Sequence, residues 1–166
     1  IQQLNINWLK AEAGSPIKTV GQNVSSSSAL LQFTNSDPAN FNLITTDRYG
    51  GAVAYTTSPE QFDLSSEAWR IAAYNDGVGS IYISSPTYDV IQGYYITIAV
   101  PVLRQPCCGV AGVLHAKYRL KPLEKQLEQV QSDKSKIESY LVNFDGTRLD
   151  TTAGTDIKVP ETELPH

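Results

Sequence analysis

Two basic side chains and a histidine stand where they could hold an anion. His115 and Lys117 lie two residues apart in the run 109–120, whose β-branched and apolar residues predict a strand. Because strand side chains alternate between faces, both share a face with Val113. Lys117 offers a point charge and Arg70, in a predicted helix, a bidentate fork, so together they suit a carboxylate or another anion. His115 could also donate a hydrogen bond, and its titration would make the affinity depend on pH.

Aromatic, hydroxyl and carboxylate side chains on neighbouring predicted elements would complete such a site. The runs 79–85 and 94–102 are rich in β-branched and aromatic residues, which predicts two more strands. The further candidates are Trp69, Tyr82, Ser84, Tyr88, Asp89, Tyr95 and Thr97. Aromatic walls with a few polar anchors are typical of pockets for small polar ligands. The sequence therefore predicts a small-molecule ligand as the partner of these side chains.

Each candidate also has a plain structural interpretation. Lys117 can extend its charged end to solvent from the end of the strand, and Arg70 can be a solvated charge on an exposed helix face. Trp69 and His115 can belong to the core, and Asp89 can hydrogen-bond its own backbone in a turn. Both interpretations stay open at the level of the sequence.

Composition excludes several classes of function. The chain has two histidines, and it shows no triad spacing, Gly-rich phosphate loop or metal-ligand cluster, so we expect no catalysis, no cofactor and no metal. The net charge of −4 argues against a nucleic-acid partner, which needs a basic face. No apolar run approaches the about 20 residues that a membrane helix needs.

The cysteines Cys107 and Cys108 are adjacent. Two cysteines in one turn cannot link distant parts of a fold, and a metal site usually needs further ligands at defined spacings. Two plain thiols are the simpler interpretation. A strained disulfide between them, acting as a redox switch, is the alternative.

The first forty residues, 1–40, predict an amphipathic helix that kinks or restarts at Ser15 and Pro16, a helix-capping residue followed by a residue suited to a first turn. Its apolar stripe is Ile6, Leu9, Ala13, Ile17, Val20, Val24 and Leu31. Such a helix can pack on its own sheet or on a second copy of the chain, and the two can both hold.

In the rest of the chain the predicted strands are grouped together and do not alternate strictly with helices. A hairpin over 41–57 turns at Gly50 and Gly51, and a helix over 64–74 is capped by Ser65 or Ser66. A loop at 86–89 precedes the strands 94–102 and 109–120. A helix then covers 121–139, a strand–Asp-Gly–strand pattern spans 140–150, and the tail 151–166 reads as loop. Strands in runs favour an α+β fold with an antiparallel sheet.

Residues 41–120 resemble Cache domains, the PAS-like sensor modules of bacterial receptors. The resemblance rests on the order of Thr46-Asp47-Arg48-Tyr49-Gly50, Glu67-Ala68-Trp69, Tyr88-Asp89, Ile98-Ala99-Val100-Pro101 and Gly109-Val110-Ala111-Gly112-Val113. It implies a central antiparallel five-stranded sheet, a covering helix, and a long N-terminal helix in residues 1–40. Residues 121–139 would be a connecting helix, and 140–166 either begin a second, truncated module or fold back onto the first sheet.

Cache domains lie outside the membrane in receptors that feed histidine kinases, diguanylate cyclases or chemoreceptor signalling domains. The resemblance thus implies an extracytoplasmic ligand-sensing domain whose parent is anchored in the membrane. Amine-binding members hold the ligand's ammonium with a carboxylate near the position of Lys117, and they carry an aromatic pair where Arg70 follows Trp69. Both departures favour an anion over an amine. The alternative is a module without a ligand that serves as a dimerisation domain through the N-terminal helix.

Overall fold

The computed structural model describes residues 2–12, 14–20, 24–104, 109–133, 141–143, 145–150 and 155–158. These residues form two compact units. Unit 1 comprises Ile1–Ser84 and Thr97–Lys117, and unit 2 comprises Ser85–Ile96 and Tyr118–His166. The cysteines at 107 and 108 lie outside the described residues. No described helix is long and apolar enough to cross a membrane.

Unit 1 begins with three helices, α1 (Gln2–Lys10), α2 (Pro16–Val20) and α3 (Val24–Ser36). The predicted restart at Pro16 is confirmed. The predicted stripe is wrong in α1, because Ile6 and Leu9 are 44% and 61% exposed.

The residue of α1 that faces the core is Trp8, which is 1% exposed. Its indole nitrogen donates a hydrogen bond to the carbonyl of Pro59 at 3.0 Å. A short helix of nine residues can bury little more than one large side chain, and the indole both buries the most surface and finds a partner for its N–H. Ile6 and Leu9 are therefore left on the outer side of α1.

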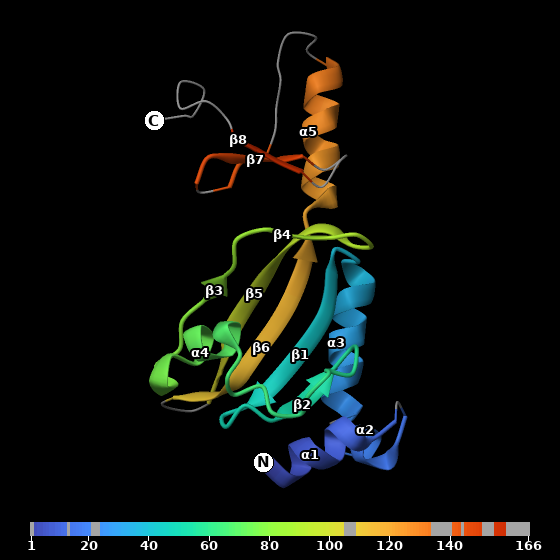
Figure 1. The fold of residues 1–166 in the computed structure, drawn as a ribbon, viewed down its shortest axis with the longest axis vertical. Coiled ribbons are helices and arrows are strands. Elements are labelled where there is room, and N and C mark those ends of the chain that lie inside the picture. The colour runs from blue at the N-terminus through green and yellow to red at the C-terminus, as the bar shows by residue number, and fades with distance from the viewer. Residues whose placement is uncertain are drawn as a thin grey trace. The chain divides into compact units, whose positions relative to one another are not determined.

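The sheet of unit 1 has the strand order β2-β1-β6-β5-β3 (Figure 1). Its strands are β1 (Asn40–Asp47), β2 (Ala52–Tyr55), β3 (Tyr82–Ile83), β5 (Gly93–Leu103) and β6 (Val110–Arg119). The first two form the predicted antiparallel hairpin, with Ile44 opposite Tyr55. Gly50 supplies the positive φ of 96° that the turn requires. The α+β fold and the five-stranded sheet that the resemblance implied are confirmed, and β4 (Thr87–Asp89) pairs with β5 as a sixth strand. Strand β3 is shorter than the run 79–85.

Helix α4 (Ala68–Tyr74) starts later than predicted. Its N-cap is Glu67, which makes no side-chain capping bond, so the predicted cap at Ser65 or Ser66 is wrong. The cause is local: the backbone N–H of Ser65 is bonded to the carboxylate of Asp63, which holds this segment in a turn before the helix.

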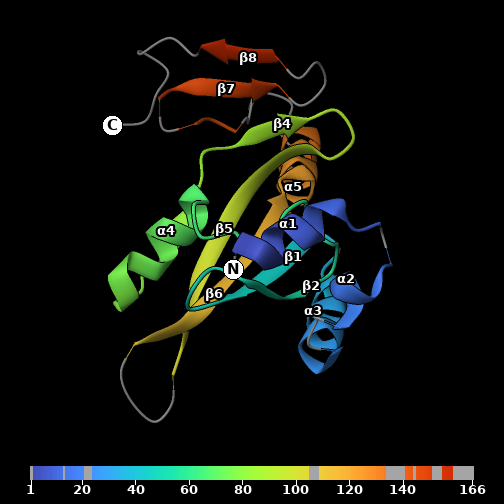
Figure 2. The same ribbon diagram turned by 60° about the horizontal axis from the view of Figure 1, so that its bottom comes forward.

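Helices α1 and α4 cover the same face of the sheet. Trp8 belongs to a core cluster with the buried residues Ile44, Ala52, Tyr55 and Leu64. Trp69 of α4 packs against this cluster and also against a second one formed by Ala73, Ala99 and Val113. Helix α3 packs along β1 and β2, and Figure 2 shows α1 crossing beside these strands. Trp69 thus joins the two halves of the core of unit 1.

Unit 2 contains β4 (Thr87–Asp89), α5 (Lys121–Asp133), β7 (Thr147–Asp150) and β8 (Thr155–Lys158). The loop predicted at 86–89 is wrong, since β4 pairs antiparallel with β5 and sets Tyr88 opposite Tyr94. The tail is not all loop either, because β8 pairs with β7. The core of this unit is the cluster Tyr94, Leu120 and Leu149.

Candidate functional site

The predicted site residues divide between the two units. Unit 1 holds Trp69, Arg70, Tyr82, Ser84, Thr97, His115 and Lys117. Unit 2 holds Tyr88, Asp89 and Tyr95. We call the seven candidates of unit 1 the α4 site, after the helix that carries Trp69 and Arg70, and describe them first.

The α4 site centres on a contact between a helix and the middle of the sheet. The ring of Trp69 lies 4.5 Å, centroid to centroid, from the imidazole of His115, with the ring planes tilted by 41°. Trp69 and Tyr82 both pack against the core cluster that includes Val113 of β6 and Ala99 of β5. The structure therefore brings Trp69, Tyr82 and His115 together on the face that strand alternation predicted.

His115 is neutral near pH 7. It is 3% exposed, and burial lowers its pKa to about 4, helped by the charge of Lys117 and opposed by a hydrogen bond to the backbone of Asn42. Its Nδ1 is buried and has no hydrogen-bond partner among the described residues. In a neutral imidazole one nitrogen donates and the other accepts, so Nδ1 is available for a hydrogen bond.

Arg70 is buried rather than solvated, with an exposed fraction of 9%. One terminal nitrogen donates to the backbone carbonyl of Arg48, and the guanidinium carbon lies 4.3 Å from the centroid of the Tyr74 ring. The N–H on Nε has no acceptor in the described part of the chain. The guanidinium is thus held by the Arg48 carbonyl and the Tyr74 ring, while its buried Nε–H donor is unused.

Ser84 and Thr97 link the two strands that border the α4 site. The N–H of Thr97 donates to the Ser84 hydroxyl at 2.9 Å, and the N–H of Ser84 donates to the Thr97 carbonyl at 2.9 Å. These bonds extend the pairing of β3 with β5, in which Tyr82 lies opposite Ala99. The Ser84 hydroxyl therefore serves the sheet in this structure.

The three candidates of unit 2 form a separate group. Asp89 accepts hydrogen bonds from the N–H groups of Ile91 and Gln92 at 2.8 and 2.9 Å, which is the turn interpretation of this residue. Tyr88 lies edge-on to Tyr94 with 5.1 Å between ring centroids. Tyr95 lies opposite Thr87 in the β4–β5 pair.

Sequence reasoning missed the residues that hold Arg70. Tyr74 lies one helical turn after Arg70, a spacing that could have indicated the ring contact. Arg48 takes part through its backbone carbonyl, for which a sequence carries no signal. No group of three or more His, Cys, Asp or Glu side chains in the described residues could hold a metal ion.

Comparison with known proteins finds similarity at the level of structure. No protein-family model matches the chain, and no curated protein matches it. The ligand-binding domain of the amino-acid chemoreceptor PctC of Pseudomonas aeruginosa PAO1, in complex with GABA, superposes with a TM-score of 0.57 at 16% identity. An extracellular ligand-binding receptor from Desulfohalobium retbaense superposes with a TM-score of 0.56 at 16% identity.

These alignments cover 95% and 97% of the present chain. The chain spans 66% of the chemoreceptor domain and 29% of the second protein. At this identity the likeness concerns the fold. The chain therefore has the fold of extracellular sensor domains of the Cache type, as the order of its sequence landmarks predicted.

Proposed function

We propose that the chain is an extracytoplasmic ligand-sensing domain of a bacterial receptor, and that its α4 site binds a small anionic metabolite, most simply a carboxylate. The observation that carries the proposal is the buried guanidinium of Arg70. Within the described residues it has no carboxylate partner, and its Nε–H has no acceptor. Buried charges in proteins are normally paired, so an anion bound here would supply what the chain does not.

Charge at the edge of the α4 site supports an anion over an amine. Lys117 lies near enough to His115 for its charge to lower the pKa of the imidazole. Two cationic side chains attract a carboxylate and repel an ammonium group. The neutral His115 adds an unpartnered nitrogen, Nδ1, which would form a hydrogen bond with a hydroxyl of the ligand.

A thermal-shift panel of small organic acids, with amines of similar size, tests the proposal. An acid present at about 100 times its dissociation constant would stabilise the protein by about 2.7 kcal/mol. For a domain of this size that raises Tm by roughly 5–10 °C. Lys117→Gln should reduce the shift, while Lys10→Gln, which removes an exposed charge from α1, should leave it unchanged. A panel in which amines raise Tm and acids do not would contradict the anionic class.

A dimerisation module is the second candidate, because α1 and α3 expose apolar side chains. Leu9, Leu31 and Phe33 are among the exposed large apolar residues of these helices. Sedimentation equilibrium should then show a dimer that Leu9→Glu dissociates. Ile83→Glu, at an exposed apolar position on β3, is the control. A monomer at every concentration would contradict this candidate.

The properties of the whole receptor belong to the same proposal. Its membrane anchor and its output domain, whether a histidine kinase, a diguanylate cyclase or a chemoreceptor domain, would lie outside this chain. That residues 140–166 begin a second module, and that Cys107 and Cys108 form a redox switch, stay predictions. Titration of free thiols before and after reduction tests the redox switch.

A further inference from the structure

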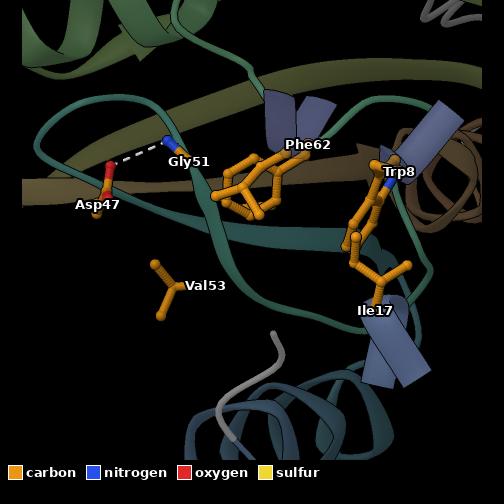
Figure 3. A pocket seen from close by; sticks show the side chains of 8 residues that line it. Trp8, Ile17, Asp47, Gly51, Val53 and Phe62 are labelled. Carbon is orange, nitrogen blue, oxygen red and sulfur yellow. Dashed lines mark hydrogen bonds between the residues drawn. The ribbon is translucent and has the colours of Figure 1, made fainter. Parts of the chain in front are cut away.

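A cavity of about 380 Å³ lies at the sheet edge of unit 1, and none of the residues that line it belongs to the α4 site. Its walls come from α1, α2, the end of β1, the turn that follows it, the start of β2 and the segment after β2. Figure 3 shows Trp8 and Ile17 on one side, Asp47 on the other and Phe62 between them. The volume falls within the range of about 300–1,000 Å³ that is typical of small-molecule sites.

The walls of this cavity are apolar and held in place. The rings of Trp8 and Phe62 lie 5.6 Å apart, and Trp8 is anchored by its bond to the Pro59 carbonyl. Asn5 of α1 accepts hydrogen bonds from the N–H groups of Phe62 and Asp63 at 2.9 and 3.2 Å. Two side chains of α1 thus fix the loop on which Phe62 stands, so the apolar wall does not depend on one contact.

Among the described residues that line the cavity, Asp47 has the one charged side chain. The ammonium of Lys18 lies 5.6 Å from the centroid of the Trp8 ring. Oδ1 of Asp47 accepts hydrogen bonds from the N–H groups of Tyr49 and Gly51 at 2.8 and 2.9 Å. Its Oδ2 makes no hydrogen bond within the described part of the chain and stands on the side of Gly51 that faces Phe62, 3.4 Å from where a Cβ at Gly51 would lie. A side chain at Gly51 would also meet the Phe62 ring at 3.1 Å, so the glycine keeps this corner open.

We propose that this cavity is a second ligand site, distinct from the α4 site, which binds a small hydrophobic amine. The apolar group of the ligand would lie against Trp8, Phe62 and Ile17, where burial of apolar surface supplies most of the affinity. The ammonium group would donate to Oδ2 of Asp47, the one charged acceptor among the described side chains of the wall. An anion of the same shape is repelled by this carboxylate. Such a ligand would contact α1 and β2 at once.

The chain has two tryptophans, and each reports on one site: Trp8 lines this cavity, and Trp69 belongs to the α4 site. In a ¹H–¹⁵N spectrum each indole N–H gives one signal, and Trp69→Phe identifies which is which. With 2-phenylethylamine as the probe, we expect a saturable shift of the Trp8 signal that is larger than any shift of the Trp69 signal, because Trp8 lines the cavity and Trp69 does not. 3-Phenylpropionate should leave the Trp8 signal in place.

Three variants test the assignment. Val53→Phe should abolish the shift by filling the cavity, whereas the same change at Val78, which is 76% exposed, should not. Asp47→Asn keeps the Oδ1 acceptor and should weaken binding of the amine about tenfold, as the loss of a hydrogen bond to a charged group does. A Trp8 signal that stays unmoved up to the solubility of the probe overturns the proposal. So does a shift confined to Trp69, or an equal response to the amine and the acid.

The test of this second site and the test of the α4 site can succeed or fail separately. An organic acid that raises Tm while phenylethylamine leaves Trp8 unmoved supports the proposed sensor and refutes the second site. The reverse pattern refutes the anionic ligand and leaves the second site standing.

Discussion

The buried neutral imidazole of His115 makes the stability of unit 1 depend on pH. Its pKa is about 4 in the folded protein, while an exposed histidine has a pKa of about 6.5. The unfolded chain therefore binds a proton more readily than the folded chain. The resulting stabilisation is fully present above pH 6.5, declines as the pH falls, and is lost once the pH reaches about 4.

The magnitude follows from these two values. A difference of about 2.5 pKa units corresponds to about 3 kcal/mol over the whole window, and the ring is 3% exposed, so solvent screening removes little of it. Between pH 7 and pH 5 the folded state should lose about 2 kcal/mol from this histidine alone.

Urea unfolding at pH 7 and pH 5 measures this loss. In His115→Phe, whose ring can still lie against Trp69, the pH-dependent part should disappear even if the variant is less stable at both values. The second histidine, His166, provides the matched control, since His166→Gln should keep the full dependence. A variant at position 115 with the same slope as the natural protein would refute the neutral, buried imidazole.

Other predictions concern packing and charge. Gly112→Ala should destabilise the protein by more than about 3 kcal/mol in urea unfolding, because its Cβ would lie 1.9 Å from the carbonyl oxygen of Thr46 on the adjacent strand; a change under about 1 kcal/mol would contradict the tight β1–β6 contact. Trp8→Phe should cost about 1–3 kcal/mol by leaving the Pro59 carbonyl without its donor, and a neutral effect would mean that this bond does not anchor α1. Lys117→Gln should raise the pKa of the imidazole in an NMR titration, since the lysine charge lowers it, and an unchanged or lower pKa would place Lys117 elsewhere.

The sheet and its hairpins could be predicted because their signals are local. Gly93 and Gly109 mark the starts of β5 and β6, and Gly50 with Gly51 marks the β1–β2 turn. Strand alternation then placed His115 correctly beneath the covering helix. These patterns depend on backbone conformation, which short stretches of sequence determine.

The rest depended on contacts between distant segments. Trp8 was passed over because the periodicity of α1 pointed to its aliphatic residues, while the bond that buries Trp8 is made by Pro59, 51 residues away. Strand β4 was missed because the turn made by Asp89 reads equally well as a loop. The charge state of His115 follows from burial, which a sequence does not display.

A crystal structure of the protein with the organic acid that raises Tm most would test the anionic ligand at the α4 site most directly. The account predicts a carboxylate oxygen within hydrogen-bond distance of Arg70 Nε, with the ammonium of Lys117 beside the same group. A ligand bound elsewhere, with Arg70 Nε still lacking an acceptor, would contradict the claim that the buried guanidinium is the anion receptor.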